Sequence, residues 1–235
     1  MVIQLAPETD IAENLAAVKA RIAEAAEAAG RSPGEVTLVA VGKAHPAGHV
    51  RRAVEAGHRV FGENRIDEAE AKWPALKAAN PDVRLHLIGP LQRNKVRRAL
   101  DLFDVIESVD RPRLARALAE EMDRRGHRPD CFIQVNTGEE SQKSGIHPAE
   151  ADEFIDACRD DLGLPVRGLM CIPPQDDEPS LHFALLREIA RRNGLGDLSM
   201  GMTADFDVAV RFGATHVRVG TALFGPRPPF NRNRG

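Results

Sequence analysis

Tyrosine is absent from the sequence, tryptophan occurs once, and cysteine occurs only three times in 235 residues. The cysteines, Cys131, Cys158 and Cys171, are odd in number and show no CxxC spacing, which argues against a disulfide framework and against a zinc site. The histidines between residues 45 and 58 show no metal-ligand spacing with nearby carboxylates. We therefore expect a reduced, cytoplasmic protein without a metal.

Long apolar runs and an excess of one charge are also missing. No run approaches a membrane span, and the first residues, MVIQLAPETD, lack the layout of a signal peptide. The 32 basic residues nearly balance the 35 acidic ones, which gives a net charge of −3. We expect neither a nucleic-acid nor a membrane partner. The 43% hydrophobic content is ample for one large core.

Short apolar runs alternate with amphipathic runs along the whole chain. The periodicity predicts helices at 9–30, 46–57, 65–80, 93–102, 111–126, 147–162, 178–194 and 203–213. Strands are predicted at 36–43, 59–64, 84–90, 103–109, 131–138, 165–173, 197–202 and, with a final turn, 215–225. Eight strand-then-helix units indicate parallel strands joined by right-handed crossovers.

Eight parallel strands in a chain of this length favour a closed (β/α)8 TIM barrel over an open doubly wound sheet, since no GxGxxG follows the first strand. We expect a single domain over residues 1–235, with an N-terminal helix in 1–30, the barrel in 36–225 and a tail in 226–235. The tail is too short and proline-rich for a full eighth helix. The extra N-terminal helix should cover that part of the barrel.

The working groups of such a barrel collect at the carboxyl ends of its strands. The residues expected there are Lys43, Glu63, Asn64, Gly89, Asn136, Thr137, Ile172, Gly201 to Thr203, Gly220 and Thr221. Strand alternation places Lys43 on one face with Val39 and Val41. If that face lines the barrel, a dry wall favours the uncharged amine, which can form a Schiff base with a carbonyl. A rim ion pair with Glu63 is the alternative.

Small residues at the last two strand ends indicate an anion site. Gly201, Thr203, Gly220 and Thr221 can offer backbone N–H and hydroxyl groups, although caps and turns alone also explain them. A phosphate site after strands seven and eight recurs in this barrel. A Schiff-base lysine facing a phosphate site indicates a phosphorylated aldehyde, either pyridoxal phosphate or the sugar phosphate of an aldolase.

Arg218 distinguishes these two ligands. It lies two residues before Gly220 and therefore on the same face of the strand. If Gly220 faces the mouth of the barrel, Arg218 faces the interior one layer below the mouth. A guanidinium can only donate, so beside a pyridine nitrogen it favours the unprotonated ring and weakens the ring as an electron sink. The alternative is a core ion pair with Glu107 or Asp205.

Seven segments together resemble the pyridoxal phosphate homeostasis proteins, the YggS/PROSC family. The resemblance runs from about residue 36 to 225 and is carried by VAVGKAHP, FGEN, HLIGPLQRNK, KSGI, RGLMCIP, SMGMTAD and VRVGTALFG. It implies an alanine-racemase-like barrel that holds pyridoxal 5'-phosphate. The family usually has serine where this chain has Gly42 and Thr203.

The resemblance also implies roles for six residues. Lys43 would form the Schiff base, Asn64 would lie near the ring and Arg218 would face the pyridine nitrogen. Phosphate contacts are implied for Thr203, Gly220 and Thr221. Outside this set, we interpret His86 as a hydrogen-bonded core histidine or a lining residue, and Lys143 as a loop lysine or a second cofactor amine.

The missing tyrosine bears on catalysis, because racemases of this barrel type oppose the lysine with a tyrosine base. We therefore favour a non-enzymatic carrier that takes part in vitamin B6 homeostasis and supplies cofactor to PLP-requiring apo-enzymes. A monomer is expected by analogy. The alternatives are a PLP-dependent amino-acid racemase or decarboxylase with an unrecognised second base, an aldolase, and a purely structural barrel.

Overall fold

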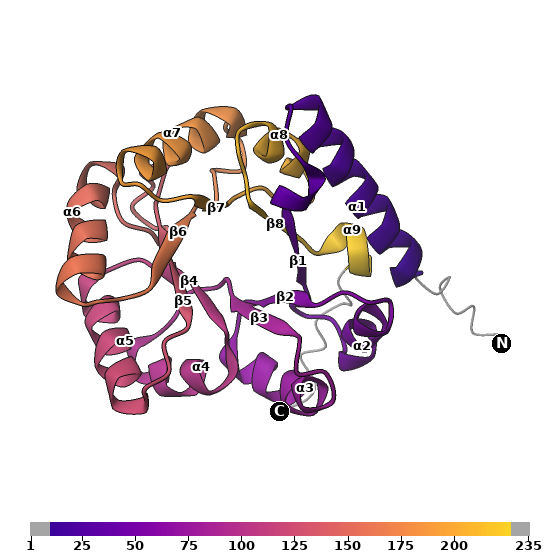
Figure 1. The fold of residues 1–235 in the computed structure, drawn as a ribbon, viewed down its shortest axis with the longest axis horizontal. Helices are drawn as coiled ribbons and strands as arrows, with labels where there is room; N and C mark the ends of the chain where they lie inside the picture. The colour runs from indigo at the N-terminus through magenta and orange to yellow at the C-terminus, as the bar shows by residue number, and fades with distance from the viewer. Residues whose placement is uncertain (1–9, 227–235) are drawn as a thin grey trace.

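The strands form a closed ring of parallel neighbours (Figure 1). The computed structural model describes residues 10–226. The ring closes where β8 pairs with β1, with Val39 opposite Arg218. In chain order the strands are β1 (Thr37–Val41), β2 (Val60–Glu63), β3 (Arg84–Leu87), β4 (Val105–Val109), β5 (Asp130–Gln134), β6 (Val166–Met170), β7 (Asp197–Ser199) and β8 (His216–Val219). The predicted TIM barrel is confirmed.

Helices surround the ring on its outside (Figure 1). They are α1 (Ile11–Ala28), α2 (Ala47–Glu55), α3 (Ile66–Ala79), α4 (Val96–Leu102), α5 (Pro112–Arg125), α6 (Ala151–Asp156), α7 (Pro179–Arg192), α8 (Phe206–Arg211) and the short α9 (Thr221–Phe224). Short 3-10 turns precede β1, α4 and α6, and a π turn follows α6.

The extra N-terminal helix occupies the place of a missing barrel helix. Asp10 caps α1, because its Oδ1 accepts hydrogen bonds from the Ala12 and Glu13 backbone N–H groups at 3.0 Å. The helix packs between α2 and α8 and against α9, as expected (Figure 1). Residues 1–9 of the predicted 1–30 segment and residues 227–235 of the predicted tail lie outside the described residues.

The seventh unit is shorter than predicted in both its strand and its helix. The strand expected over 197–202 ends at Ser199, and the helix expected from residue 203 begins at Phe206. Gly201 makes the turn with φ +88°, and a Cβ there would lie 2.5 Å from the Cβ of Ala209. Only glycine fits this close approach of the turn to α8. The result is a longer loop at the carboxyl end of β7.

Side chains on the two faces of the strands differ in polarity. Outward-facing residues such as Leu38, Phe61 and Leu85 join the main core beneath the helices. The interior holds a small apolar cluster of Val105, Phe132 and Met170, together with buried polar groups described below. The barrel interior is therefore partly polar.

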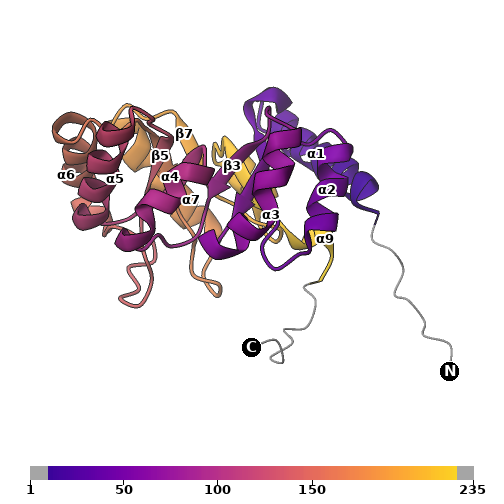
Figure 2. The same cartoon turned by 90° about the horizontal axis from the view of Figure 1, so that it is seen from below.

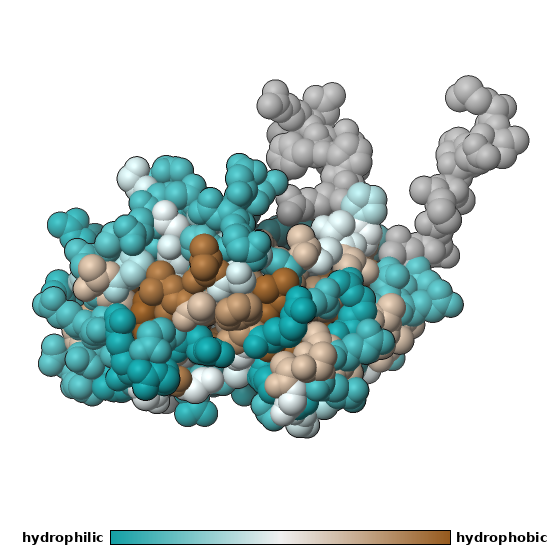
Figure 3. All heavy atoms as spheres, turned by 90° about the horizontal axis from the view of Figure 1, so that it is seen from above, coloured by the Kyte–Doolittle hydropathy of each residue, from teal (hydrophilic) through white to brown (hydrophobic). Residues whose placement is uncertain are grey.

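The long loops and an exposed apolar patch lie on different parts of the molecular surface. Figure 2 shows the long loops after β5 and β6 projecting from the side on which α9 lies. Figure 3 shows apolar surface over α7 and α8, where Leu181 is 70% exposed. No helix within residues 10–226 is long and apolar enough to cross a membrane.

His58, between α2 and β2, makes folding stability depend on pH. It is buried, and its Nε2 lies 2.7 Å from the Val60 carbonyl oxygen. Burial lowers the pKa of His58 from 6.5 to about 4. Because the unfolded chain then binds the proton more tightly, this stability is complete above pH 6.5 and is lost as the pH falls toward 4, by about 3 kcal/mol.

Urea unfolding of the wild type and His58→Gln at several pH values measures this contribution. We expect the wild type to lose about 3 kcal/mol more than the variant between pH 7 and pH 4. Parallel pH profiles of the two proteins would contradict the assignment to His58.

Candidate functional site

A cavity of about 260 Å³ lies at the carboxyl ends of the strands. It is smaller than the roughly 300–1,000 Å³ typical of sites for drug-sized ligands. Its apolar wall includes Val41, Ile88 and Ile172. All six residues singled out from the sequence line it: Lys43, Asn64, Thr203, Arg218, Gly220 and Thr221. The geometry therefore brings the whole predicted set together around space for a small ligand.

Lys43 lies in the loop between β1 and α2, and Lys72 on α3 anchors that loop. The Lys72 Nζ donates to the carbonyl oxygens of Gly42 at 2.8 Å and His45 at 3.3 Å. Glu68 contributes from the same helix, since its Oε1 accepts from the Ala44 N–H at 2.5 Å and from Lys72 at 2.8 Å. The loop that carries Lys43 is thus attached to α3 on both sides of that residue.

Glu63 completes this buried cluster. Its Oε1 lies 2.8 Å from the Lys72 Nζ and accepts the Trp73 indole N–H at 3.0 Å. Burial raises the pKa of Glu63, while Lys72 and Trp73 oppose the increase. The carboxylate considered from sequence as a rim partner of Lys43 therefore pairs with Lys72. A Cβ at Gly42 would lie 2.9 Å from the same oxygen, so the small residue suits this packing.

Asn64 is fixed by a close backbone approach. Gly89 after β3 lies so near Asn64 that a Cβ on Gly89 would be 2.7 Å from the Asn64 Cα. The Asn64 Oδ1 is buried and has no hydrogen-bond partner within residues 10–226. A buried acceptor without a donor is costly, so a ligand with a donor would satisfy it.

Two turns close one side of the cavity. The turn from β7 to α8 contributes Thr203 and Ala204, and the turn from β8 to α9 contributes Gly220 and Thr221. None of these four backbone N–H groups has an acceptor in the part of the chain that the structure describes. Adjacent unpaired N–H groups suit an anion, above all a phosphate.

Arg218 lines the same cavity, and two hydrogen bonds fix its guanidinium. Nη1 donates to Ser199 Oγ and Nη2 to the Cys171 carbonyl oxygen, both at 2.7 Å. Ser199 in turn donates to Glu107 Oε2 at 2.6 Å. The contact with Glu107 thus runs through Ser199, whereas Asp205 accepts the Met202 N–H. A guanidinium carries five N–H groups, so others remain for a ligand.

Comparison with known proteins identifies the family. The model of the alanine racemase N-terminal domain matches residues 14–228. A pyridoxal phosphate homeostasis protein of Pseudomonas aeruginosa is 45% identical over 222 residues, which cover 92% of this chain and 96% of the relative. The chain belongs to the pyridoxal phosphate homeostasis protein family. A member from Escherichia coli strain K12 is 39% identical over 93% of this chain and 97% of its own.

A solved structure supports the same assignment. PipY of Synechococcus elongatus with PLP bound is 38% identical, with a TM-score of 0.79, over 92% of this chain and all of that chain. The family resemblance read from the sequence motifs is confirmed. The sequence did not reveal that Lys72 anchors the Lys43 loop or that Ser199 and Glu107 are linked to Arg218. These contacts join elements that are distant in sequence.

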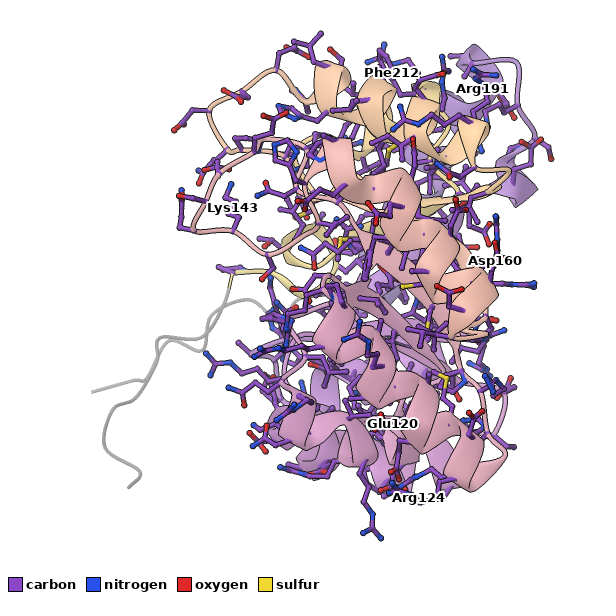
Figure 4. The ribbon with its side chains drawn as sticks, turned by 90° about the vertical axis from the view of Figure 1, so that its left-hand side faces the viewer. Glu120, Arg124, Lys143, Asp160, Arg191 and Phe212 are labelled. Atoms are coloured by element: carbon purple, nitrogen blue, oxygen red, sulfur yellow. The ribbon has the colours of Figure 1, made fainter. Side chains whose placement is uncertain are left out.

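Two further residues considered from the sequence lie elsewhere. The His86 Nδ1 lies 2.6 Å from Glu107 Oε1 in the barrel interior, which confirms a hydrogen-bonded core histidine. Lys143 lies on the projecting loop after β5 (Figure 4), with its Nζ 2.5 Å from Glu140 Oε2. Neither residue lines the cavity at the strand ends.

A larger cavity, about 440 Å³, lies between α5 and α6 on the outside of the barrel. Its wall includes Arg116, Glu150 and Phe154, which come from neighbouring helices and their connections. The smaller cavity differs from it in chemistry, because an amine, a guanidinium and backbone N–H groups without acceptors in the described chain converge there at the strand ends. Within residues 10–226, no three potential metal ligands cluster.

Proposed function

We propose that this protein binds pyridoxal 5'-phosphate in the strand-end cavity and takes part in intracellular PLP homeostasis without strong catalytic turnover. One observation carries the proposal. Lys43 and Arg218 line the same cavity as four residues whose backbone N–H groups lack acceptors in the described chain. PipY, which is 38% identical, has been solved with PLP bound. Curated relatives carry the name pyridoxal phosphate homeostasis protein.

The cavity residues fit the chemical groups of this cofactor. PLP would supply a reactive aldehyde when bound, and Lys43 would offer the amine that holds it as a Schiff base. Thr203, Gly220 and Thr221 then hold the phosphate through N–H and hydroxyl donors. Arg218 would donate toward the ring nitrogen, and Asn64 would lie near the ring.

The cavity wall favours a carrier over a racemase or decarboxylase. Among its described lining residues, only Lys43 and Arg218 have ionisable side chains, so a second base is not at hand. Cys171 lies nearby, but burial raises the pKa of its thiol to about 12. A protonated thiol cannot accept a proton from a substrate. Arg218 would also disfavour protonation of the ring nitrogen, which would restrain carbanion chemistry.

The same proposal extends to partners and location. We infer one cofactor-binding domain over residues 1–235 that acts as a monomer and supplies PLP to apo-enzymes that require it. A cytoplasmic location is supported by the cysteines: Cys131, Cys158 and Cys171 are all buried and free of disulfides.

Titration of the purified apoprotein with PLP tests the binding proposal. We expect a visible absorbance band that saturates at one equivalent, and weaker binding of pyridoxal because it lacks the phosphate. Adding amino acids in deuterated water should then give no sustained exchange at the α-carbon. Absence of the band would contradict PLP binding, whereas sustained exchange would make the protein an enzyme.

A further inference from the structure

A chain of hydrogen bonds crosses the barrel interior from Arg218 toward the opposite end. Arg218 on β8 donates to Ser199 on β7 at 2.7 Å, and Ser199 Oγ lies 2.6 Å from Glu107 Oε2 on β4. The other carboxylate oxygen of Glu107 lies 2.6 Å from His86 Nδ1 on β3. Two pairs of consecutive strands, β3 with β4 and β7 with β8, thus contribute one side chain from each strand.

The direction of every hydrogen bond in this chain is determined. Arginine can only donate, so Ser199 Oγ accepts a hydrogen bond from Arg218. The Ser199 hydroxyl then donates its own hydrogen bond to Glu107. Burial raises the pKa of Glu107, but the hydrogen bond from His86 and the charges of His86 and Arg218 outweigh burial and lower it to about 2. Glu107 is therefore an ionised acceptor, and His86 carries its proton on Nδ1.

The chain is almost completely shielded from solvent. Glu107 and Ser199 are 0% exposed, His86 is 3% exposed and Arg218 is 4% exposed. Inside the protein the dielectric constant is lower than in water, so the electrostatic interaction of an ionised carboxylate with a charge at a given distance is stronger. Only the Ser199 hydroxyl separates the Glu107 carboxylate from the guanidinium, so the two opposite charges attract each other with little screening.

The titratable neighbours of this chain lie around the amino ends of the strands, and Arg84, Asp130 and Arg167 are among them. His86 and His216 line a second cavity of about 240 Å³ at the amino ends of the strands, with their ring centroids 5.9 Å apart. Burial lowers the pKa of His216, and Asp197 lies in the same cavity wall. Cys171, the first residue after β6, accepts from Arg218 with its carbonyl oxygen. Glu107 is the only carboxylate hydrogen-bonded within the chain among the described residues.

We propose that Ser199 and Glu107 are positioning residues for the cofactor site, which fix the Arg218 guanidinium and offset its charge toward the bound ring. This inference rests on the proposed function. A guanidinium held by Ser199 and Cys171 has one orientation relative to the cavity. Its partial neutralisation by Glu107 limits the positive potential near the cofactor nitrogen atoms and at the Lys43 linkage.

A spectroscopic pH titration of the PLP-loaded Glu107→Gln protein measures the charge. Glutamine keeps the shape of the side chain but removes the negative charge, so a protonated linkage at Lys43 becomes less favourable. We expect the midpoint of the absorbance titration to move to lower pH by about one unit. Ser199→Ala should move it less and raise the PLP dissociation constant about tenfold, because the guanidinium loses one of its two fixed acceptors.

Ser108→Ala is the matched control. Ser108 follows Glu107 on β4 and is equally buried, but its hydroxyl has no partner within residues 10–226. Its removal should leave both the midpoint and the affinity unchanged. Circular dichroism and thermal unfolding of each apoprotein separate folding defects from site effects.

The outcomes distinguish this inference from the function on which it rests. No visible band in the wild type would remove the proposed function itself. A normal wild-type band with identical titrations in Glu107→Gln, Ser199→Ala and Ser108→Ala would overturn the positioning role alone. Lowered midpoint in Glu107→Gln and weakened binding in Ser199→Ala, with an unchanged control, would establish it.

Discussion

Replacing Lys43 with alanine is expected to abolish retention of PLP. The variant should lose the visible absorbance band, and dialysis should remove all cofactor, because only noncovalent contacts to Arg218 and the two turns remain. Its fold should persist, since Lys43 lies in a loop rather than in the core. Absorbance spectra before and after dialysis, with circular dichroism, provide the measurement.

Lys143→Ala is the control for this experiment. Lys143 is a second amine on the face that carries the long loops, but it pairs with Glu140 and does not line the cavity. The variant should keep the band and its cofactor through dialysis. A band that survives in Lys43→Ala and disappears in Lys143→Ala would instead place the linkage on the projecting loop.

Replacing Lys72 with methionine is expected to destabilise both the fold and the site. Lys72 is 7% exposed at its side chain and neutralises Glu63, which is fully buried. Loss of one partner of a buried ion pair costs about 3–5 kcal/mol in free energy of unfolding. The loss should be smaller at pH 5 than at pH 8, because burial raises the pKa of Glu63 and the orphaned carboxylate can then take up a proton.

Two further variants separate stability from positioning. Lys77→Met removes a lysine of the same helix that pairs with Asp104 at 2.7 Å, away from the Lys43 loop, and should leave PLP release unchanged. The double variant Lys72→Met/Glu63→Gln should recover much of the unfolding free energy. It should still release PLP faster than the wild type, because Gly42 and His45 lose their anchor. Wild-type release from the double variant would show that Lys72 acts only on stability.

The barrel was predictable because its signals are local. Each strand is a short apolar run followed by an amphipathic helix, and parallel connections of this kind leave few topologies for eight units. Boundaries were less predictable where loops follow the strands. At the end of β7, Gly201 turns the chain at a positive φ, and the expected strand stops three residues early.

The composition of the cavity wall was predictable for a geometric reason. The carboxyl ends of parallel strands meet at one end of a barrel, so Lys43, Asn64, Thr203 and Gly220 converge whatever the details of packing. Parity along β8 then placed Arg218 on the same face. Their chemical roles stay predictions, because geometry alone does not establish what each residue binds.

The supporting contacts were not predictable, because they join elements through the three-dimensional register. Glu68 and Lys72 have i,i+4 spacing, which ordinarily indicates a solvated surface pair. Only the packing of α3 against β2 buries Lys72 beside Glu63. Likewise, nothing local to Ser199 or Glu107 indicates that a hydroxyl on β7 joins a carboxylate on β4 to Arg218.

Chemical trapping of the cofactor tests the central claim most directly. The PLP-loaded protein is reduced with borohydride, digested and analysed by mass spectrometry to locate the phosphopyridoxyl group. We predict stoichiometric modification of the peptide that contains Lys43 and no modification of the peptide that contains Lys143. Label found on another lysine, or none at all after loading, would contradict the assignment of Lys43 as the residue that holds the cofactor.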